Sequence, residues 1–525
     1  MKAYFQDIRL TTHSLIKMTV AILLGFFITA LVGSWALADR NLIRRAHWIY
    51  SQQGRRAGEE FLHEVLSRHV ENREAWLLLV RLRSEVVIGR PFEPEDLDPF
   101  LTDAEFDLFL DRSSQIQPEI LRAWWDWGRG DEERALRRLH ALPEDSEVLL
   151  AAAGICAESD QTEKAIQYWT RLLALEPENP EATDGLLQGL LSLGDEARFR
   201  ELLADPGVDS RLDPEIPYRF YLSKREYLAA LPYLYRDQLA HYSWALIVAC
   251  LAVGLCWVAL CLHIGGGWDW QPRTQVMAGV ALLLGIASAL ACLAVVVVMD
   301  HEMVLRGRGM FSSLILSLII GVREELIKLL FLLPLVPFLA RNRNHLQIIS
   351  IASLVGLGFA MEENANYYLA SSGSGVVGRF LTANFFHLTL TGYCGYYLVR
   401  AVQIGGEAWH TFLTELSKMI LFHAAYDFFL IEPSLAEYSI FSSILFIWLS
   451  QQYLRLVLSM KLPRGRRVSL TRVFVACLAI ATGIHYLFLS DVYGVMEAIW
   501  ITGSNVFGVI IIAFMFFHEF DERVA

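Results

Sequence analysis

The chain has 525 residues, of which 54% are hydrophobic and 19% are charged, and its mean hydropathy is +0.37. This apolar composition excludes an ordinary soluble protein, and a formal net charge of −12 excludes a protein that binds nucleic acid through a basic surface. Seven cysteines, most of them inside apolar runs, give no pattern of a disulfide framework.

The first predicted element is an apolar segment at residues 14–37, which follows a short polar leader. It is long enough to cross a bilayer, since about 20 residues span the hydrocarbon core. The segment ends in an A-x-A pattern at 36–38, which is also typical of a cleaved signal peptide. Lys17 inside the segment and the polar leader favour a retained anchor over residues 1–38.

The second predicted element, residues 39–241, is a helical domain outside the membrane. Charged residues are frequent here, and apolar residues recur at helical spacing. The motifs LPED at 142–145 and EPEN at 176–179 lie 34 residues apart, the period of a tetratricopeptide-type repeat. We therefore expect a helical-repeat domain, with an irregular helical domain as the alternative. Such repeats usually hold proteins or peptides, so a protein partner is expected on this domain.

The rest of the chain, residues 242–525, is almost continuously apolar and predicts a multi-span membrane domain. We expect nine spans, at 242–264, 274–299, 311–340, 347–369, 376–400, 409–430, 438–458, 470–489 and 496–517. Pro334 and Pro337 should kink or end the third of them. With the first segment this makes about ten spans, and the expected fold class is an all-α polytopic membrane protein with an extramembrane helical domain.

Basic residues in the short loops orient these spans. Nine lie on one side of the predicted membrane: Arg273, Arg341, Arg343, Arg400, Lys461, Arg464, Arg466, Arg467 and Arg472. Only three lie on the other side: Arg306, Arg308 and Arg379. The asymmetry places the first set in the cytoplasm and residues 39–241 outside it, in the periplasm if the protein lies in the inner membrane of a two-membrane bacterium.

Four of the predicted spans carry ionisable residues where hydrocarbon is expected. The groups are Glu324, Glu325 and Lys328, then Glu362 and Glu363 beside Asn364, then His387, and then His423 with Asp427. A charge at the centre of a membrane helix costs roughly 2.5–3.5 kcal/mol on insertion scales, so such residues are usually functional. At 1.5 Å of rise per residue, the four groups lie about 9 to 20 Å from the outer ends of their helices and can meet.

Spacing within the helices supports a shared site. Glu324 and Lys328 are four residues apart, so the lysine can neutralise one carboxylate. His423 and Asp427 have the same spacing, which lets the carboxylate orient the imidazole. Small residues that permit close helix contact flank the ionisable groups in two spans: Gly356, Gly358, Gly392 and Gly395.

These motifs, taken in chain order, resemble those of the PrsW family of intramembrane proteases. The order is EExxK at 324–328, FxxxEN at 359–364, the intramembrane His387, and HxxxD at 423–427. The resemblance covers roughly 310–430, and the family is related to the CAAX-processing and bacteriocin-immunity membrane proteases. CAAX-type members carry an arginine after the glutamate pair and a histidine in place of the FxxxEN glutamate, so the resemblance is closer to PrsW.

The resemblance implies hydrolysis of a peptide bond in a membrane-anchored substrate, which for PrsW itself is an anti-sigma factor. The expected catalytic residues are Glu324, Glu325, Glu363, His387 and His423, supported by Lys328, Asn364 and Asp427. Both metal-dependent and glutamate-dependent mechanisms have been described for such enzymes. No HExxH motif is present and Lys328 adds positive charge, so a metal-free mechanism is favoured. Zinc held by His387, His423 and Glu363 is the alternative.

In the metal-free mechanism Glu324 takes a proton from a water molecule that Glu363 helps to hold. His423, oriented by Asp427, would donate to the oxyanion, and His387 is a second donor or a metal ligand. Glu325 and Lys328 would position Glu324. Two other function classes remain open, a proton-coupled transporter and a non-catalytic scaffold. The transporter predicts symmetry between two halves, which the sequence does not show.

Overall fold

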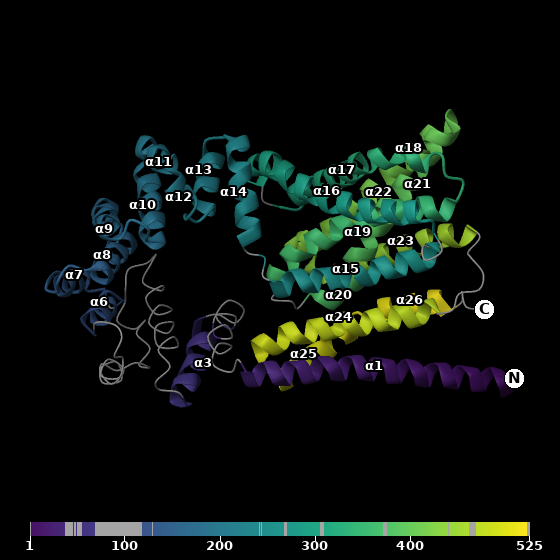
Figure 1. Ribbon diagram of the computed structural model, residues 1–525, viewed down its shortest axis with the longest axis horizontal. Coiled ribbons are helices and arrows are strands. Elements are labelled where there is room, and N and C mark those ends of the chain that lie inside the picture. Colours follow the sequence, from purple (N-terminus) through teal and green to yellow (C-terminus); the bar gives the residue numbers. More distant parts are fainter. Residues whose placement is uncertain are drawn as a thin grey trace. The chain divides into compact units, whose positions relative to one another are not determined.

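The computed structural model describes residues 2–36, 55–68, 118–128, 130–240, 244–266, 270–304, 309–370, 375–438, 440–460 and 469–521, together with a few single residues. Within these residues the secondary structure is helical throughout (Figure 1). The chain divides into two compact units, one formed by residues 37–239 and the other by residues 1–36 together with 240–525. Each unit is described by itself.

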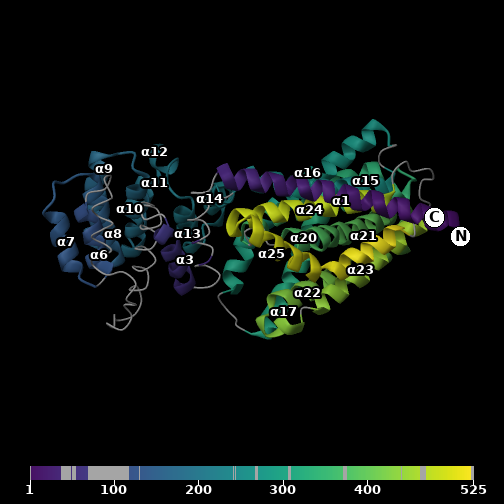
Figure 2. The ribbon, with the colours of Figure 1, turned by 90° about the horizontal axis from the view of Figure 1, so that it is seen from below.

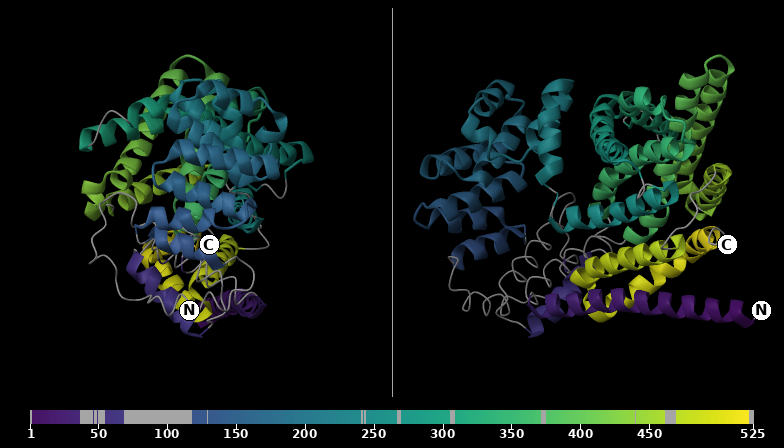
Figure 3. Two further views of the ribbon diagram at one scale, coloured as in Figure 1. Left: turned by 90° about the vertical axis from the view of Figure 1, so that its left-hand side faces the viewer. Right: turned by 45° about the vertical axis from the view of Figure 1, so that its right-hand side comes forward.

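The unit at residues 37–239 is a succession of short helices (Figures 1 and 3). They are α3 (Arg55–Arg68), α6 (Pro118–Gly128), α7 (Glu132–His140), α8 (Ser146–Glu158), α9 (Thr162–Leu175), α10 (Pro180–Leu193), α11 (Glu196–Leu203), α12 (Pro206–Asp209), α13 (Glu215–Ser223) and α14 (Tyr227–Ala240). From α6 to α12, neighbours in the chain are neighbours in space; for example, α6 packs on α7, α8 on α9 and α9 on α10.

The two motifs of the 34-residue echo occupy equivalent positions in this unit. Asp145 ends the first motif and caps α8, and its carboxylate accepts a hydrogen bond of 2.9 Å from the backbone N–H of Val148. Asn179 ends the second and caps α10 in the same way, at 3.0 Å from the N–H of Ala182. Each cap is worth about 1 kcal/mol to its helix. The echo therefore marks the start of the first helix in successive helix pairs, and assignment to the tetratricopeptide class stays a prediction.

The other unit contains the long apolar helices. They are α1 (Lys2–Ala36), α15 (Trp244–Gly265), α16 (Pro272–Val304), α17 (Met310–Leu332), η3 (Leu333–Leu335), α18 (Val336–Leu339), α19 (His345–Ala370), α20 (Val376–Leu381), α21 (Ala383–Ile404), α22 (Glu407–Ile431), η4 (Pro433–Tyr438), α23 (Ile440–Ser459), α24 (Leu470–Tyr493), α25 (Val495–Gly508) and α26 (Ile510–Asp521). Among the described residues, six of them are long and apolar enough to cross a membrane: α1, α15, α16, α19, α23 and α24. The bent pair of α25 and α26 gives a seventh candidate. The predicted all-α polytopic fold class is confirmed.

Helix α19 is the centre of this unit, with 83% of its most apolar stretch buried inside the protein. It packs against α15, α16, α17 and α21, and α22 packs against both α17 and α21 (Figure 1). Helices α17, α21 and α22 are as long as the apolar spans but do not reach the composition expected of one. These three helices and α19 carry the ionisable residues that the sequence singles out.

Three predicted spans differ from the structure in their continuity. In the 311–340 segment the regular α-helix ends at Leu332, and the chain continues as η3 and α18. Pro334 and Pro337 predict this change. The 376–400 segment is broken at Thr382, whose hydroxyl bonds the carbonyl of Gly378 at 2.9 Å. The 496–517 segment bends by 60° between α25 and α26, after Gly508. The prediction of one continuous helix was wrong in the last two cases, where Thr and Gly weaken the helix locally.

Helix α1 lies along α24 (Figure 2). Gly483 of α24 makes this possible, because a methyl group there would lie 2.0 Å from the ring of Phe26. Ala30 is buried in the same contact, beside Tyr486 and Leu489. The contact agrees with a retained anchor, and retention stays a prediction.

Candidate active site

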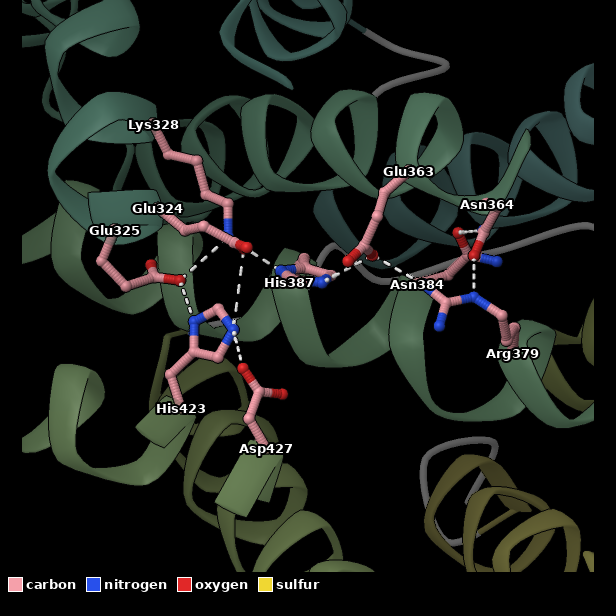
Figure 4. Close-up of polar contacts among 10 residues, drawn as sticks. All are labelled: Glu324, Glu325, Lys328, Glu363, Asn364, Arg379, Asn384, His387, His423 and Asp427. Carbon is pink, nitrogen blue, oxygen red and sulfur yellow. Dashed lines mark hydrogen bonds and ion pairs between the residues drawn. The ribbon is translucent and has the colours of Figure 1, made fainter. Parts of the chain in front are cut away.

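Four helices bring the predicted residues to one place in the membrane unit (Figure 4). Helix α17 supplies three of them, α19 two, α21 one and α22 two. In chain order they are Glu324, Glu325, Lys328, Glu363, Asn364, His387, His423 and Asp427. All eight take part in one connected set of hydrogen bonds and ion pairs, together with Arg379 and Asn384.

Lys328 is the centre of this set and is fully buried. Its Nζ atom lies 2.9 Å from Glu325 Oε1, 3.3 Å from Glu324 Oε2 and 2.8 Å from His387 Nδ1. The ammonium also lies 4.0 Å from the centre of the Phe359 ring, an additional favourable contact for a cation. The sequence predicts neutralisation of one carboxylate, and the structure shows that the lysine holds two carboxylates and a histidine at once.

His423 is held from both sides by carboxylates. Its Nδ1 lies 2.9 Å from Glu325 Oε1, while its Nε2 lies 3.4 Å from Asp427 Oδ2 and 3.6 Å from Glu324 Oε2. The sequence interpretation gave Asp427 the task of orienting this imidazole. The expected contact with Asp427 is present, and Glu325, from a different helix, makes a shorter contact with the opposite ring nitrogen.

Glu363 forms the other end of the set. Its Oε2 lies 3.2 Å from His387 Nε2 and accepts a hydrogen bond of 2.6 Å from Arg379 Nη2. Asn364, the next residue, accepts a hydrogen bond from Nε of the same arginine. His387 therefore bridges the two halves of the site, with Lys328 at one ring nitrogen and Glu363 at the other.

Sequence reasoning missed Arg379 and Asn384 and misplaced Glu362. The sequence analysis counts Arg379 among the few basic loop residues on its side of the membrane. Its position shortly before His387 in the chain is the signal that could have indicated a place in the site. The sequence groups Glu362 with Glu363, and in the structure Glu362 accepts a hydrogen bond of 2.9 Å from the hydroxyl of Tyr242. Neighbours on a helix point about 100° apart, so Glu362 lies outside the cluster.

The charges of the cluster do not cancel. Four carboxylates face two permanent cations: Glu324, Glu325, Glu363 and Asp427 against Lys328 and Arg379. With neutral histidines, two negative charges remain, and one buried oxygen, Glu325 Oε2, has no hydrogen-bond partner among the described residues. Uncompensated buried charge is costly, so a divalent cation or additional protons would stabilise the site.

The residues present fit a metal ion. Glu324, His387 and His423 each offer one ligand atom, and these atoms all lie within 4.8 Å of one another in a buried position. Two imidazoles and one carboxylate are a common ligand set of catalytic zinc, with a further position open for water. The contact of Glu325 with Nδ1 of His423 is the outer carboxylate that metal-bound histidines usually have. The zinc set inferred from sequence contained Glu363 in place of Glu324, whereas Glu363 contacts His387.

Access to the cluster differs between its two ends. The Glu363 and Asp427 side chains are 24% and 19% exposed, whereas Glu324 is 10% and Glu325 only 1% exposed. Lys328 and Glu325 therefore form the closed end. The cluster is open to its surroundings at Glu363 and Asp427.

Glycines allow the helices of the site to approach each other. A methyl group on Gly356 of α19 would lie 2.1 Å from the carbonyl oxygen of His387 on α21. A methyl group on the other glycines expected to permit close contact would also clash with a neighbouring helix. The neighbour is α16 for Gly358 and α19 for Gly392 and Gly395. That prediction is confirmed. Gly321, one turn before Glu324, has the same role between α17 and α22, where a methyl group would lie 2.9 Å from the carbonyl oxygen of Ile420.

Carboxylates, imidazoles and a lysine gathered inside an all-helical membrane bundle are typical of an intramembrane hydrolase. Residues 271–450 match the model of a family described as PrsW family intramembrane metalloprotease. The matched segment is about a third of the chain and includes all four helices of the site. The match supports the PrsW resemblance and identifies the protein as a peptidase, which argues against the transporter and the scaffold. No curated protein matches the chain.

Proposed function

We propose that the membrane unit hydrolyses a peptide bond of a membrane-anchored protein at the cluster around Glu324, His387 and His423. The observation that carries the proposal is the convergence of these three ligand atoms within 4.8 Å at the centre of the matched segment. A substrate of the anti-sigma-factor kind, cleaved as the first step of a signalling cascade, is the candidate that the PrsW resemblance favours.

The same geometry, together with the description of the matched family, favours the zinc alternative over the metal-free mechanism that the sequence favours. Glu324, His387 and His423 would hold the ion, and its charge would balance the two excess negative charges of the cluster. A bound zinc ion supplies Lewis acidity toward water and the scissile carbonyl.

The remaining residues divide the other tasks. Glu363 is the most exposed carboxylate of the cluster, so it is placed to take the proton from the attacking water and pass it to the leaving amine nitrogen. Glu325 orients His423 through Nδ1. Lys328 keeps Glu324 and Glu325 in place. In this proposal Glu324 is a ligand, and the role of base that the sequence assigns to it belongs to Glu363.

The test uses the purified full-length protein in lipid vesicles with a single-span substrate. We expect about one zinc ion per chain, cleavage near the membrane surface, loss of cleavage on strong chelation, and recovery when zinc is returned. Elemental analysis and mass spectrometry of the products provide the measurements. Cleavage that survives chelation in metal-free protein would restore the glutamate mechanism, and wild-type protein without any cleavage would contradict the function itself.

We also propose that residues 39–241 lie outside the cytoplasm of the cell membrane and hold a protein, with the exported part of the substrate as the candidate. The nine-to-three distribution of basic loop residues supports the location, and the paired helices support the binding role. A reporter fused near Gly207 should behave as exported, and one fused near Gly465 as cytoplasmic. A cytoplasmic Gly207 fusion would remove both the location and any contact with an exported segment.

A further inference from the structure

Arg379 makes an unusual number of contacts for a residue outside the sequence motifs. It lies on α20, the short helix that precedes α21. Its Nη2 donates to Glu363 at 2.6 Å and its Nε donates to Asn364. Its guanidinium carbon lies 3.7 Å from the centre of the Tyr367 ring, so one face is covered as well. Two edges and one face of a single guanidinium are therefore engaged with α19.

The contacts on Glu363 are concentrated on one oxygen. Both Arg379 Nη2 and His387 Nε2 approach Oε2, from 2.6 and 3.2 Å. A carboxylate fixed at one oxygen from two directions has a defined orientation, and Oε1 is then the oxygen that faces away from these contacts. The carboxylate of Glu363 therefore does not rotate freely and presents one defined oxygen, Oε1. A proton acceptor is effective only when it is oriented in this way.

Arg379 is itself held in position by a chain of amides. Asn364 receives the Nε–H of the arginine and donates its own Nδ2–H to Asn384 Oδ1 at 2.9 Å. Both asparagines are buried. Because Asn364 belongs to α19 and Asn384 to α21, the guanidinium is aligned by the same two helices that carry Glu363 and His387 (Figure 4).

We propose that Arg379 is a positioning residue for the reaction, which turns Oε1 of Glu363 toward the water that attacks the peptide bond. This inference rests on the proposed function, and specifically on Glu363 as the proton acceptor. The planar guanidinium is essential to it, since Nε and Nη2 must reach two different residues at once, which the single ammonium of a lysine cannot reproduce in the same geometry.

The test compares Arg379→Ala and Arg379→Lys with wild-type protein in vesicles. For Arg379→Ala we expect kcat to fall by about 10²-fold, the typical effect of a small misplacement of a reacting group, with KM, zinc content and thermal midpoint retained. Guanidinium ion, added well below denaturing concentrations, should restore part of kcat, whereas methylammonium should not. Arg379→Lys should stay impaired although it keeps the charge.

Arg400→Ala is the matched control, since Arg400 lies near the other end of α21 and its guanidinium donates to Gln403 at 2.8 Å. It should show wild-type kcat and no response to guanidinium. The inference is overturned by wild-type kcat in Arg379→Ala or Arg379→Lys. It is also overturned if both variants lose zinc or thermal stability together with activity, which would show a structural role. Absence of cleavage by wild-type protein would instead contradict the proposed function.

Discussion

Glu324→Gln should remove the bound metal and the proteolytic activity together, whereas Glu363→Gln should remove the activity and leave the metal in place. Glu324 belongs to the group of three potential ligands, and an amide is a much poorer zinc ligand than a carboxylate. Glu363 lies beyond His387 and is exposed enough to meet water. Loss of a general base lowers kcat by about 10²–10⁴-fold. Zinc analysis and cleavage assays on the same preparations distinguish the two effects.

Glu362→Gln is the control for this pair, because Glu362 is next to Glu363 in the chain but bonds Tyr242 outside the cluster. It should keep both zinc and activity. Loss of zinc in Glu363→Gln would return Glu363 to the ligand set, as inferred from sequence. Wild-type cleavage by Glu324→Gln would contradict both the ligand role and the earlier assignment of Glu324 as the base.

Gly356→Ala should separate α19 from α21 and disable the site without changing any of its ionisable residues. The new methyl group would lie 2.1 Å from the carbonyl oxygen of His387 and 2.7 Å from its carbonyl carbon, and backbone atoms of a helix cannot move aside as a side chain can. Overpacking of this kind typically costs about 1–3 kcal/mol of stability. We expect a lower thermal midpoint and at least a tenfold loss of kcat, since His387 would leave the reach of Lys328 and Glu363.

Gly279→Ala on α16 provides the comparison, because a methyl group there meets no atom within 4 Å among the described residues. Its thermal midpoint and its activity should equal those of the wild type. If Gly356→Ala behaved like Gly279→Ala, the close approach of α19 and α21 would be incorrect, and with it the bridge that His387 makes between the two halves of the cluster.

The members of the candidate site were predictable because the membrane makes ionisable residues conspicuous. Glu324, Glu363, His387 and His423 stand out in apolar runs, where their cost of insertion identifies them. Arg379 had no such contrast, because an arginine in a connecting segment is ordinary. The role proposed for it depends on its contacts with Glu363 and Asn364 of α19, which no local pattern in the sequence reports.

Contacts between helices were the second limit of sequence reasoning. The spacing of His423 and Asp427 shows that they share a helix face, but it cannot show that Glu325 approaches the imidazole more closely from α17. The choice between Glu324 and Glu363 as a ligand depends in the same way on how α17 and α19 are placed against α21 and α22. Hydropathy also missed the break at Thr382, because a helix keeps its apolar composition when it bends.

The fitted contact between α1 and α24 joins segments that lie far apart in the sequence, since Phe26 precedes the whole candidate site and Gly483 follows it. During synthesis α1 enters the bilayer long before its partner exists. The face of α1 that later packs on α24 can be exposed to lipid at little cost, because lipid tails are as apolar as α24. The order of translation therefore delays this contact until α24 is inserted. A nascent chain that stops before α24 would carry the whole candidate site, while α1 would lack this partner helix.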